Sequence, residues 1–280
     1  MGTGHEGKET GRHDQPAHDR WSADDKWHFS QDLTTTFAAV EKLCYGIWRT
    51  ADQELEPIER ALLDVVGPAL LDTTAYGVRV LIEEPKGSIL RVGAQPGTGN
   101  LLCGSVSIWL DSLDERAPAE AIITDTPAAE THGWLVTESI PLGYGDKRTW
   151  PDGERSPGLS ITTVFDKKAG VADADFFRIW HREHTPLSFV IHPLWLYVRN
   201  AIVRPVTDAA AAPPIRSYVY EATPTFEDML DFHRFFGSGG DSAKLQENIE
   251  RVNTHMDTFA ETSTLQCTPM AEYVFKTFST

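Results

Sequence analysis

The sequence is poor in cysteine and in long apolar runs, and each shortage excludes a class of protein. Its three cysteines, Cys44, Cys103 and Cys267, are scattered through 280 residues, which is too sparse for a zinc knuckle. We interpret them as reduced core residues of a cytoplasmic protein. No stretch approaches the ~20 apolar residues that span a bilayer, and no secretory signal is recognisable. We therefore expect no membrane partner.

Positive charge is also scarce. The chain has 25 Lys and Arg against 41 Asp and Glu, which gives a formal net charge of −16. Nucleic-acid binding depends on clustered Lys and Arg, so no nucleic-acid partner is expected. Common catalytic motifs are missing as well. No glycine-rich phosphate loop follows a strand, and the segment GLSIT around Ser160 is not a nucleophile elbow.

What the sequence does contain is a regular alternation of strand and helix patterns. A polar stretch rich in Gly and His, residues 1–38, predicts a flexible tail. In residues 39–142, Gly67 and Pro68 should disrupt or end the first helix. Apolar periodicity in this half predicts helices over Glu54–Val66 and Ala117–Ile123, and strands over Lys42–Arg49, Ala75–Glu84, Leu101–Leu110 and Trp134–Leu142.

The same order begins again after a stretch rich in Gly, Pro and charge, residues 143–158, which predicts a linker. Residues 159–280 form the second half. Its expected helices cover Asp173–His184, a segment capped by Thr225, and an apolar stripe from Leu245 to Phe259. Its expected strands are Leu159–Lys168, Leu194–Val206, Pro214–Ala222 and Pro269–Lys276.

The two halves therefore share the order β-α-β-β-α-β, which is the ferredoxin-like pattern. Pro68 aligns with Pro186 and Glu138 with Glu272, which indicates an internal duplication. A single four-stranded sheet would leave one apolar face bare. We predict an α+β fold in which two tandem ferredoxin-like repeats pack sheet to sheet around a central cavity.

Specific residues of the second half resemble a known family. The pattern W-x-x-x-H-x-P is formed by Trp180, His184 and Pro186, and it is followed by YVRN (Tyr197–Asn200) and AEYVF (Ala271–Phe275). These motifs resemble the EthD branch of the dimeric α/β-barrel superfamily. The first half lacks the tryptophan and histidine, since Leu62 and Val66 stand at the aligned positions.

The resemblance implies an intramolecular dimeric α/β barrel with one active site and one degenerate partner. It also implies a small hydrophobic or aromatic substrate and no bound organic cofactor. Reactions of monooxygenase, cyclase, dehydratase or decarboxylating type occur in this group. The most favoured activity is that of an oxidoreductase or a lyase, and further association into homodimers stays open.

His184 is the main catalytic candidate, because an imidazole titrates near neutral pH and serves as acid or base without a metal. We expect it to act on a small hydrophobic carbonyl or phenolic molecule. On the helix it shares a face with Phe177, Trp180 and His181, which are expected to shape a substrate site. The structural alternative is a buried histidine satisfied by a carbonyl at the helix end.

Tyr197 is the second catalytic candidate, because a phenol can stabilise a developing oxyanion. Asn200 and Glu272 are candidate substrate-binding residues. Strand alternation places Tyr197 and Asn200 on opposite faces, and of the two we favour Tyr197 at the cavity. For Glu272 and Glu138, solvation at a sheet edge is the favoured interpretation over a buried functional role.

Three further alternatives stay open. His181, His184 and His192 invite a zinc site, but no carboxylate or cysteine arrives at a familiar spacing, so no metal is expected. Haem held by a histidine is another, as in some members of the superfamily. The third is a non-catalytic protein that binds an apolar metabolite.

Overall fold

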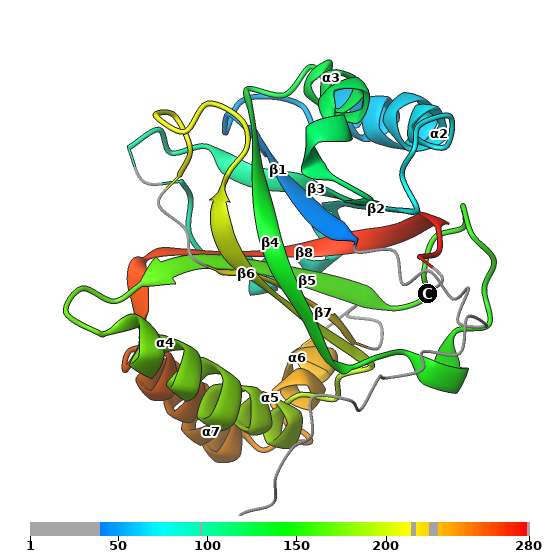
Figure 1. Cartoon of the computed structure of the whole chain (residues 1–280). Coiled ribbons are helices and arrows are strands. Elements are labelled where there is room, and N and C mark those ends of the chain that lie inside the picture. Colours follow the sequence, from blue (N-terminus) through cyan, green and yellow to red (C-terminus); the bar gives the residue numbers. More distant parts are fainter. Residues whose placement is uncertain (1–39, 96, 214–216, 224–228, 279–280) are drawn as a thin grey trace, which may run out of the picture. The chain divides into compact units, whose positions relative to one another are not determined.

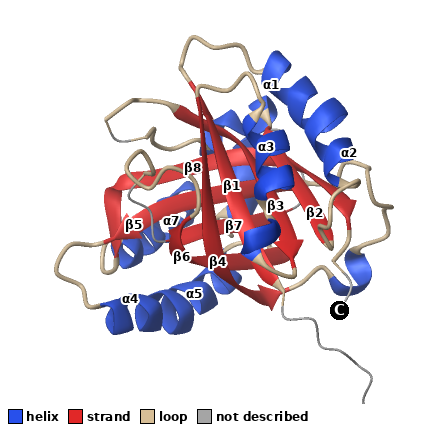
Figure 2. Cartoon of the chain, turned by 45° about the horizontal axis from the view of Figure 1, so that its top comes forward, coloured by secondary structure: helices blue, strands red, loops and turns tan. Residues whose placement is uncertain are grey.

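Strands and helices alternate along the described part of the chain in the predicted order (Figures 1 and 2). This computed structural model describes residues 40–95, 97–213, 217–223 and 229–278, and the chain from Ala38 onward forms one unit. The predicted tail and the predicted cap Thr225 lie outside the described residues. No helix within those ranges has the length and apolar character needed to cross a bilayer.

The first half matches the predicted element order with small shifts of the element ends. It contains strands β1 (Glu41–Arg49), β2 (Gly77–Glu83), β3 (Leu101–Leu110) and β4 (Glu130–Leu142). The second half contains β5 (Leu159–Lys167), β6 (Leu196–Pro205), β7 (Ser217–Thr223) and β8 (Ala260–Lys276). The helices are α1 (Glu56–Arg60), α2 (Gly67–Leu70), α3 (Ala117–Thr124), α4 (Asp173–Ile179), α5 (Thr185–Ile191), α6 (Met229–Phe235) and α7 (Ser242–Met256).

The strands close into an antiparallel barrel with the order β1-β3-β2-β8-β5-β7-β6-β4. Within each half, the first strand lies between the third and the fourth. The halves join at two seams, where β2 pairs with β8 and β4 pairs with β6. Helices α1–α3 cover the strands of the first half, and α4–α7 lie on the side of the second half (Figures 1 and 2).

Strand alternation gives the barrel an inner and an outer face. The inner face holds a cluster that includes Trp48, Trp134, Val164, Val198 and Met270, all buried. The indole of Trp48 donates a hydrogen bond to a side-chain oxygen of Gln266 across the interior, at 2.9 Å. We predicted a central cavity between the two sheets. The cluster and buried polar side chains such as Gln266 and Thr162 occupy the described barrel interior, and the cavity described below lies outside it.

The first helix of each half widens into a π-helical segment immediately before its proline. The two segments are η1 (Ala61–Val66) and η5 (Trp180–His184). A regular α-turn would bring the proline ring against the carbonyl four residues earlier, and a wider turn relieves that clash. The prediction that Gly67 and Pro68 disrupt or end the first helix is confirmed as a disruption, whereas the predicted end of the second-half helix at His184, before Pro186, was wrong. The helices continue to Leu70 and Ile191.

Two ion pairs lie inside the barrel near the first-half seam strands. Lys42 Nζ lies 2.6 Å from Glu138 Oε1, and Arg79 Nε lies 3.0 Å from Glu272 Oε1. The Tyr144 hydroxyl also donates to Glu272 at 2.7 Å. The side chain of Glu272 is 1% exposed, so the expectation of edge solvation was wrong. Burial without an ion pair would be costly for a carboxylate, and Arg79 supplies the pair.

The segment 143–158 joins the halves and packs along β8. Its Tyr144 reaches Glu272, and the backbone N–H of Ser156 donates to the carbonyl of Glu272 at 2.8 Å. Trp150 packs edge-on against Tyr144, with ring centroids 5.1 Å apart. These contacts tie the connection to the end of the barrel at which the ion pairs lie.

Replacing Glu272 by Leu should lower the free energy of unfolding by about 3 kcal/mol, because it leaves Arg79 without its carboxylate in a largely buried place. Urea unfolding measures the effect. Glu84→Leu is the matched control, since its pair with Arg155 lies at the surface, and it should cost less than about 1 kcal/mol. Equal losses for both variants would contradict a structural role for the buried pair.

Candidate functional site

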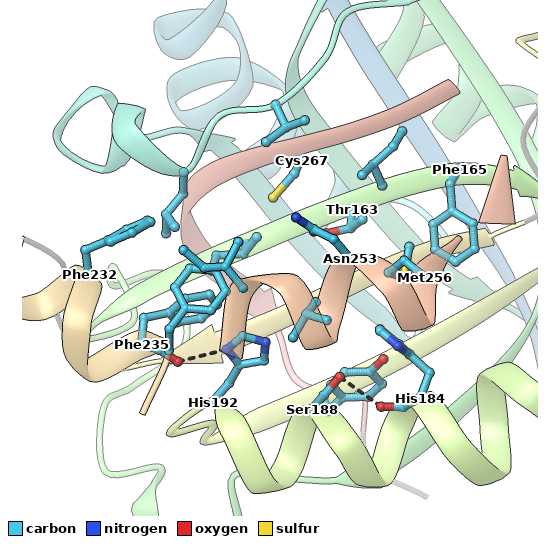
Figure 3. A pocket seen from close by; sticks show the side chains of 18 of the residues that line it. Thr163, Phe165, His184, Ser188, His192, Phe232, Phe235, Asn253, Met256 and Cys267 are labelled. Carbon is cyan, nitrogen blue, oxygen red and sulfur yellow. Dashed lines mark hydrogen bonds between the residues drawn. The ribbon is translucent and has the colours of Figure 1, made fainter. Parts of the chain in front are cut away.

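A cavity of ≈300 Å³ lies between the outer face of the second-half strands and helices α4–α7 (Figure 3). It is outside the barrel, since its β5 residues Ile161, Thr163 and Phe165 alternate with Val164 of the barrel interior. Aromatic and aliphatic side chains make up most of its wall. The lining residues are Ile89, Leu90, Val92, Ile161, Thr163, Phe165, Trp180, His184, Ser188, His192, Tyr197, Phe232, Phe235, Phe236, Ile249, Val252, Asn253, Met256, Leu265 and Cys267.

His184 enters this cavity from the last turn of the π-helical segment. Its side chain rises from the helix toward the strand residue Phe165 and toward Met256 of α7 (Figure 3). Only 8% of the residue is exposed, and its ring packs against Phe259 with centroids 5.2 Å apart. Trp180 and His184, four residues apart on one helix face, both line the cavity.

The surroundings hold His184 in its neutral form. Burial, with smaller contributions from the nearby imidazoles of His255 and His192, lowers its pKa from 6.5 to about 3. Its Nδ1 is buried and finds no hydrogen-bond partner among the described residues. The alternative of a histidine satisfied by a carbonyl at the helix end therefore has no support at that nitrogen. A neutral imidazole can accept a proton or a hydrogen bond.

Tyr197 and Asn200, the two candidate residues of β6, lie in different environments. Tyr197 lines the cavity from β6 and is 2% exposed, while Asn200 is fully buried in the barrel, on the inner face with Val198. The expected opposite orientation is observed. Tyr197 was favoured at a cavity between the sheets, but Asn200 is the residue that faces the barrel interior, and Tyr197 lines the cavity outside the barrel. The Tyr197 ring also packs edge-on against Phe189, with centroids 5.5 Å apart.

The other predicted substrate-binding residues have mixed positions. Trp180 is fully buried in the cavity wall, where it packs edge-on against Phe165. Phe177 and His181 lie on the same helix, but they are absent from the lining of this cavity. Burial and the positive charge of Arg199 lower the pKa of His181 to about 4. Glu272 and Asn200 belong to the barrel interior, so neither can touch a molecule bound in the cavity.

His192 is a cavity residue that the sequence offered only as a zinc candidate. Its Nδ1 lies 2.8 Å from the carbonyl oxygen of Phe235, which can only accept, so Nδ1 carries the proton (Figure 3). Burial lowers the pKa of His192 to about 4, although the hydrogen bond to Phe235 acts in the opposite direction. The ring is therefore neutral, and its Nε2 is an acceptor.

The first half also contributes to the cavity. The 3-10 helix η2 (Pro85–Leu90) brings Ile89 and Leu90 to the wall, and Val92 follows. Backbone hydrogen bonds between Val92 and Cys267 fix this segment against β8. Sequence reasoning assigned the glycine-rich and proline-rich connection after β2 to no site. Its apolar pair Ile89-Leu90 was the signal that could have indicated a role.

The metal and haem alternatives can be compared with the residues present. Among the described residues, no three His, Cys, Asp or Glu side chains are placed to hold a metal ion. Haem carries two carboxylates that need cationic or polar partners. None of the described residues that line the cavity is Lys or Arg, and its volume is ≈300 Å³. The cavity therefore does not fit haem.

The comparisons with known proteins show the fold. No protein-family model matches the sequence, and no curated protein matches it. Similar solved structures include an anthrone oxidase-like protein, with a TM-score of 0.51, 7% identity, and coverage of 85% of this chain and 95% of that chain. A candidate monooxygenase from Fusobacterium nucleatum has a TM-score of 0.44 and 12% identity, with coverage of 86% of this chain and 94% of that chain. A variant of chlorite dismutase from Candidatus Nitrospira defluvii has a TM-score of 0.40 and 11% identity, with coverage of 82% of this chain and 90% of that chain.

At such low identity the similarity establishes architecture and nothing more. The fold is α+β, a closed antiparallel barrel flanked by helices, and it is shared with the anthrone oxidase-like structure. On this frame the chain adds an apolar cavity outside the barrel, with two neutral imidazoles in its wall.

The depressed pKa of His184 predicts a loss of stability in acid. Between about pH 6 and pH 4 the unfolded chain binds a proton at this imidazole and the folded chain does not, so stability falls as the pH falls. His184→Phe should lower the slope of unfolding free energy against pH by about 1.4 kcal/mol per pH unit. Urea unfolding at a series of pH values measures this slope.

Ser188→Ala changes a non-titrating residue of the same cavity and should leave the slope as in the unmodified protein. An unchanged slope in His184→Phe would contradict the burial of a neutral ring.

Proposed function

We propose that the protein is an enzyme of oxidoreductase type that acts on a small, neutral aromatic molecule carrying a phenolic or enolic hydroxyl. No bound organic cofactor is required in this proposal. The observation that carries it is an apolar wall that holds two buried, neutral imidazoles, His184 and His192, with no described Lys or Arg beside them.

The polar groups of the cavity favour a hydroxyl over a carboxylate or a bare carbonyl. The neutral rings of His184 and His192 both offer acceptor nitrogens. A ligand hydroxyl can donate to such a nitrogen, whereas a carboxylate would enter an apolar wall in which no described residue is Lys or Arg. The substrate class proposed here is therefore the phenolic one, and the hydrophobic carbonyl substrates that the sequence left open are less well matched.

In the proposed reaction His184 acts as the base, and Trp180 and Phe165 form the wall that holds the ring of the substrate. At neutral pH the imidazolium is absent, so His184 does not serve as an acid on an incoming substrate. Its proton affinity is low in the empty cavity. It rises when a phenolate forms beside it, because the two opposite charges stabilise each other in the apolar surroundings. Tyr197 is proposed to assist by a hydrogen bond to the developing oxyanion.

We also propose that the two halves are tandem ferredoxin-like repeats of EthD type, with a functional site only in the second, residues 159–280. The shared element order and the two π-helical segments at aligned positions support this. In the first repeat, residues 39–142, Leu62 and Val66 occupy the positions of Trp180 and His184 and are buried in a packed cluster. That repeat is the degenerate partner.

Binding of 2-naphthol, measured by its fluorescence, tests the proposed site. Replacing His184 by Phe should weaken binding about tenfold, the effect of one lost hydrogen bond of about 1.4 kcal/mol. The same variant should leave the binding of naphthalene unchanged, which serves as the matched control. The carboxylate 2-naphthoate should bind at least about 100-fold more weakly than 2-naphthol. Equal binding of 2-naphthoate and 2-naphthol would contradict the proposed substrate class.

Oxygen uptake separates the enzyme from a binding protein. The name of the anthrone oxidase-like neighbour supports anthrone, whose enol form is a phenol, as the first substrate to assay. Uptake should depend on His184 and be lost in His184→Phe. Tight binding of 2-naphthol without oxygen uptake for anthrone or any phenol in a panel would favour the alternative, a non-catalytic protein that binds an apolar metabolite.

The residues that the first half contributes to the cavity wall give a separate prediction. Leu90→Trp should fill part of the cavity and weaken 2-naphthol binding by about tenfold or more, because the indole takes up space that the ligand needs. Ile140→Trp is the control, since Ile140 is 53% exposed and does not line the cavity. Unchanged affinity in Leu90→Trp would place the ligand elsewhere.

A further inference from the structure

His255, on α7, lies directly behind His184. The two imidazole rings have centroids 5.3 Å apart and planes inclined by 35°. On its other side, His255 Nε2 lies 3.8 Å from Glu183 Oε2, a carboxylate on the π-helical segment. The three side chains therefore form a row in which His255 occupies the middle.

This row runs between two different environments. At its inner end, His184 lines the cavity and is 8% exposed. At its outer end, Glu183 has 45% of its side chain exposed and His255 has 24%. Both outer residues line a surface groove between α5 and α7, which is formed by Glu183, Pro186, Leu187, Val190, Arg251 and His255. His255 is thus the side chain between the buried ring and the solvent-filled groove.

One buried ring nitrogen of each histidine lacks a hydrogen-bond partner among the described residues. The Nδ1 atoms of His184 and His255 are both buried, and neither has a hydrogen-bond partner among the described residues. Two adjacent rings with unused nitrogens can pass a proton after a small rotation or through one bridging water, since each neutral ring has one donor and one acceptor.

We propose that Glu183 and His255 form a proton relay that connects His184, and through it the cavity, to the surface groove. The proposal rests on the proposed function, in which His184 takes a proton from the substrate hydroxyl. The O–H bond of the substrate breaks as an N–H bond forms on His184, and His184 releases its other ring proton to His255. His255 in turn releases one to Glu183 or to water. Each ring gains one proton and loses one, so both end neutral and one proton leaves the cavity.

The charged groups around His255 favour outward transfer. Glu183 faces it from the π-helical segment and attracts a proton. Arg251, one turn earlier on α7, lines the same groove, and Arg178 forms an ion pair with Glu183. The positive charges of Arg251 and Arg178 weaken the attraction of the Glu183 carboxylate for a proton, so Glu183 passes the proton on to water. His255 and Glu183 act through His184, and they are positioning residues that do not touch the substrate.

Solvent exchange of the His184 ring N–H, measured by NMR with ¹⁵N-labelled histidine on the ligand-free protein, tests the relay. The signal is assigned by its absence in His184→Phe. His255→Phe keeps a ring in place without a titrating nitrogen, and it should slow exchange by about tenfold or more. Glu183→Gln should slow it severalfold. Glu250→Gln, which removes an equal charge from an exposed position of α7, should leave exchange unchanged.

Exchange within twofold of the unmodified protein in both His255→Phe and Glu183→Gln would overturn the relay. If His255→Phe fails to fold by circular dichroism, the surface variant Glu183→Gln decides the question alone. The outcome is distinct from that of the proposed function, because exchange is measured without ligand. A protein that fails to bind 2-naphthol yet shows the exchange effect would refute the proposed function and leave the proton connection standing.

Discussion

The closure of the strands into a barrel is the constraint on which the rest of the structure depends. Once β2 pairs with β8 and β4 with β6, every strand has one face inside and one face outside. The inside is filled by side chains such as Trp48 and Trp134, and it carries the buried ion pairs. The cavity around His184 lies on the outer face, beneath helices. The first half packs that face with Leu62 and Val66, whereas the second half leaves it open around His184.

The inner and outer faces of the barrel hold different buried polar groups: ion pairs on the inner face and histidines on the outer face. Inside the barrel, Lys42 and Arg79 each meet a carboxylate. On the outer face, His184 has aromatic neighbours and no charged partner in contact with its inner nitrogen. An imidazole in such surroundings is held neutral by desolvation. The fold thus produces a base whose strength depends on the molecule placed next to it and on the route by which its proton leaves.

Much of the element order was predictable from the sequence, because buried strands and amphipathic helices have distinct periods. Leu101–Leu110 was predicted with its observed bounds. The end of the second-half helix was predicted too early at Pro186, because the spacing of apolar residues does not reveal the π-helical turn that accommodates this proline. The face of the sheet that opens into a cavity was not predictable either, since strands apolar on both faces look alike. Glu272 was misplaced because its partner Arg79 is distant in sequence and reaches it only through the register of β2 with β8.

His184, Trp180 and Tyr197, which the sequence proposed for the site, line the cavity, whereas the sequence did not propose His192 as a wall residue or Leu90 as a contribution from the first half. A crystal structure with 6-bromo-2-naphthol tests the location of the site most directly. The account predicts an anomalous bromine peak in the cavity between β5 and α7, with the ligand hydroxyl at hydrogen-bond distance from the His184 ring. A peak inside the barrel, or a bound ligand with its hydroxyl turned away from both cavity histidines, would contradict it.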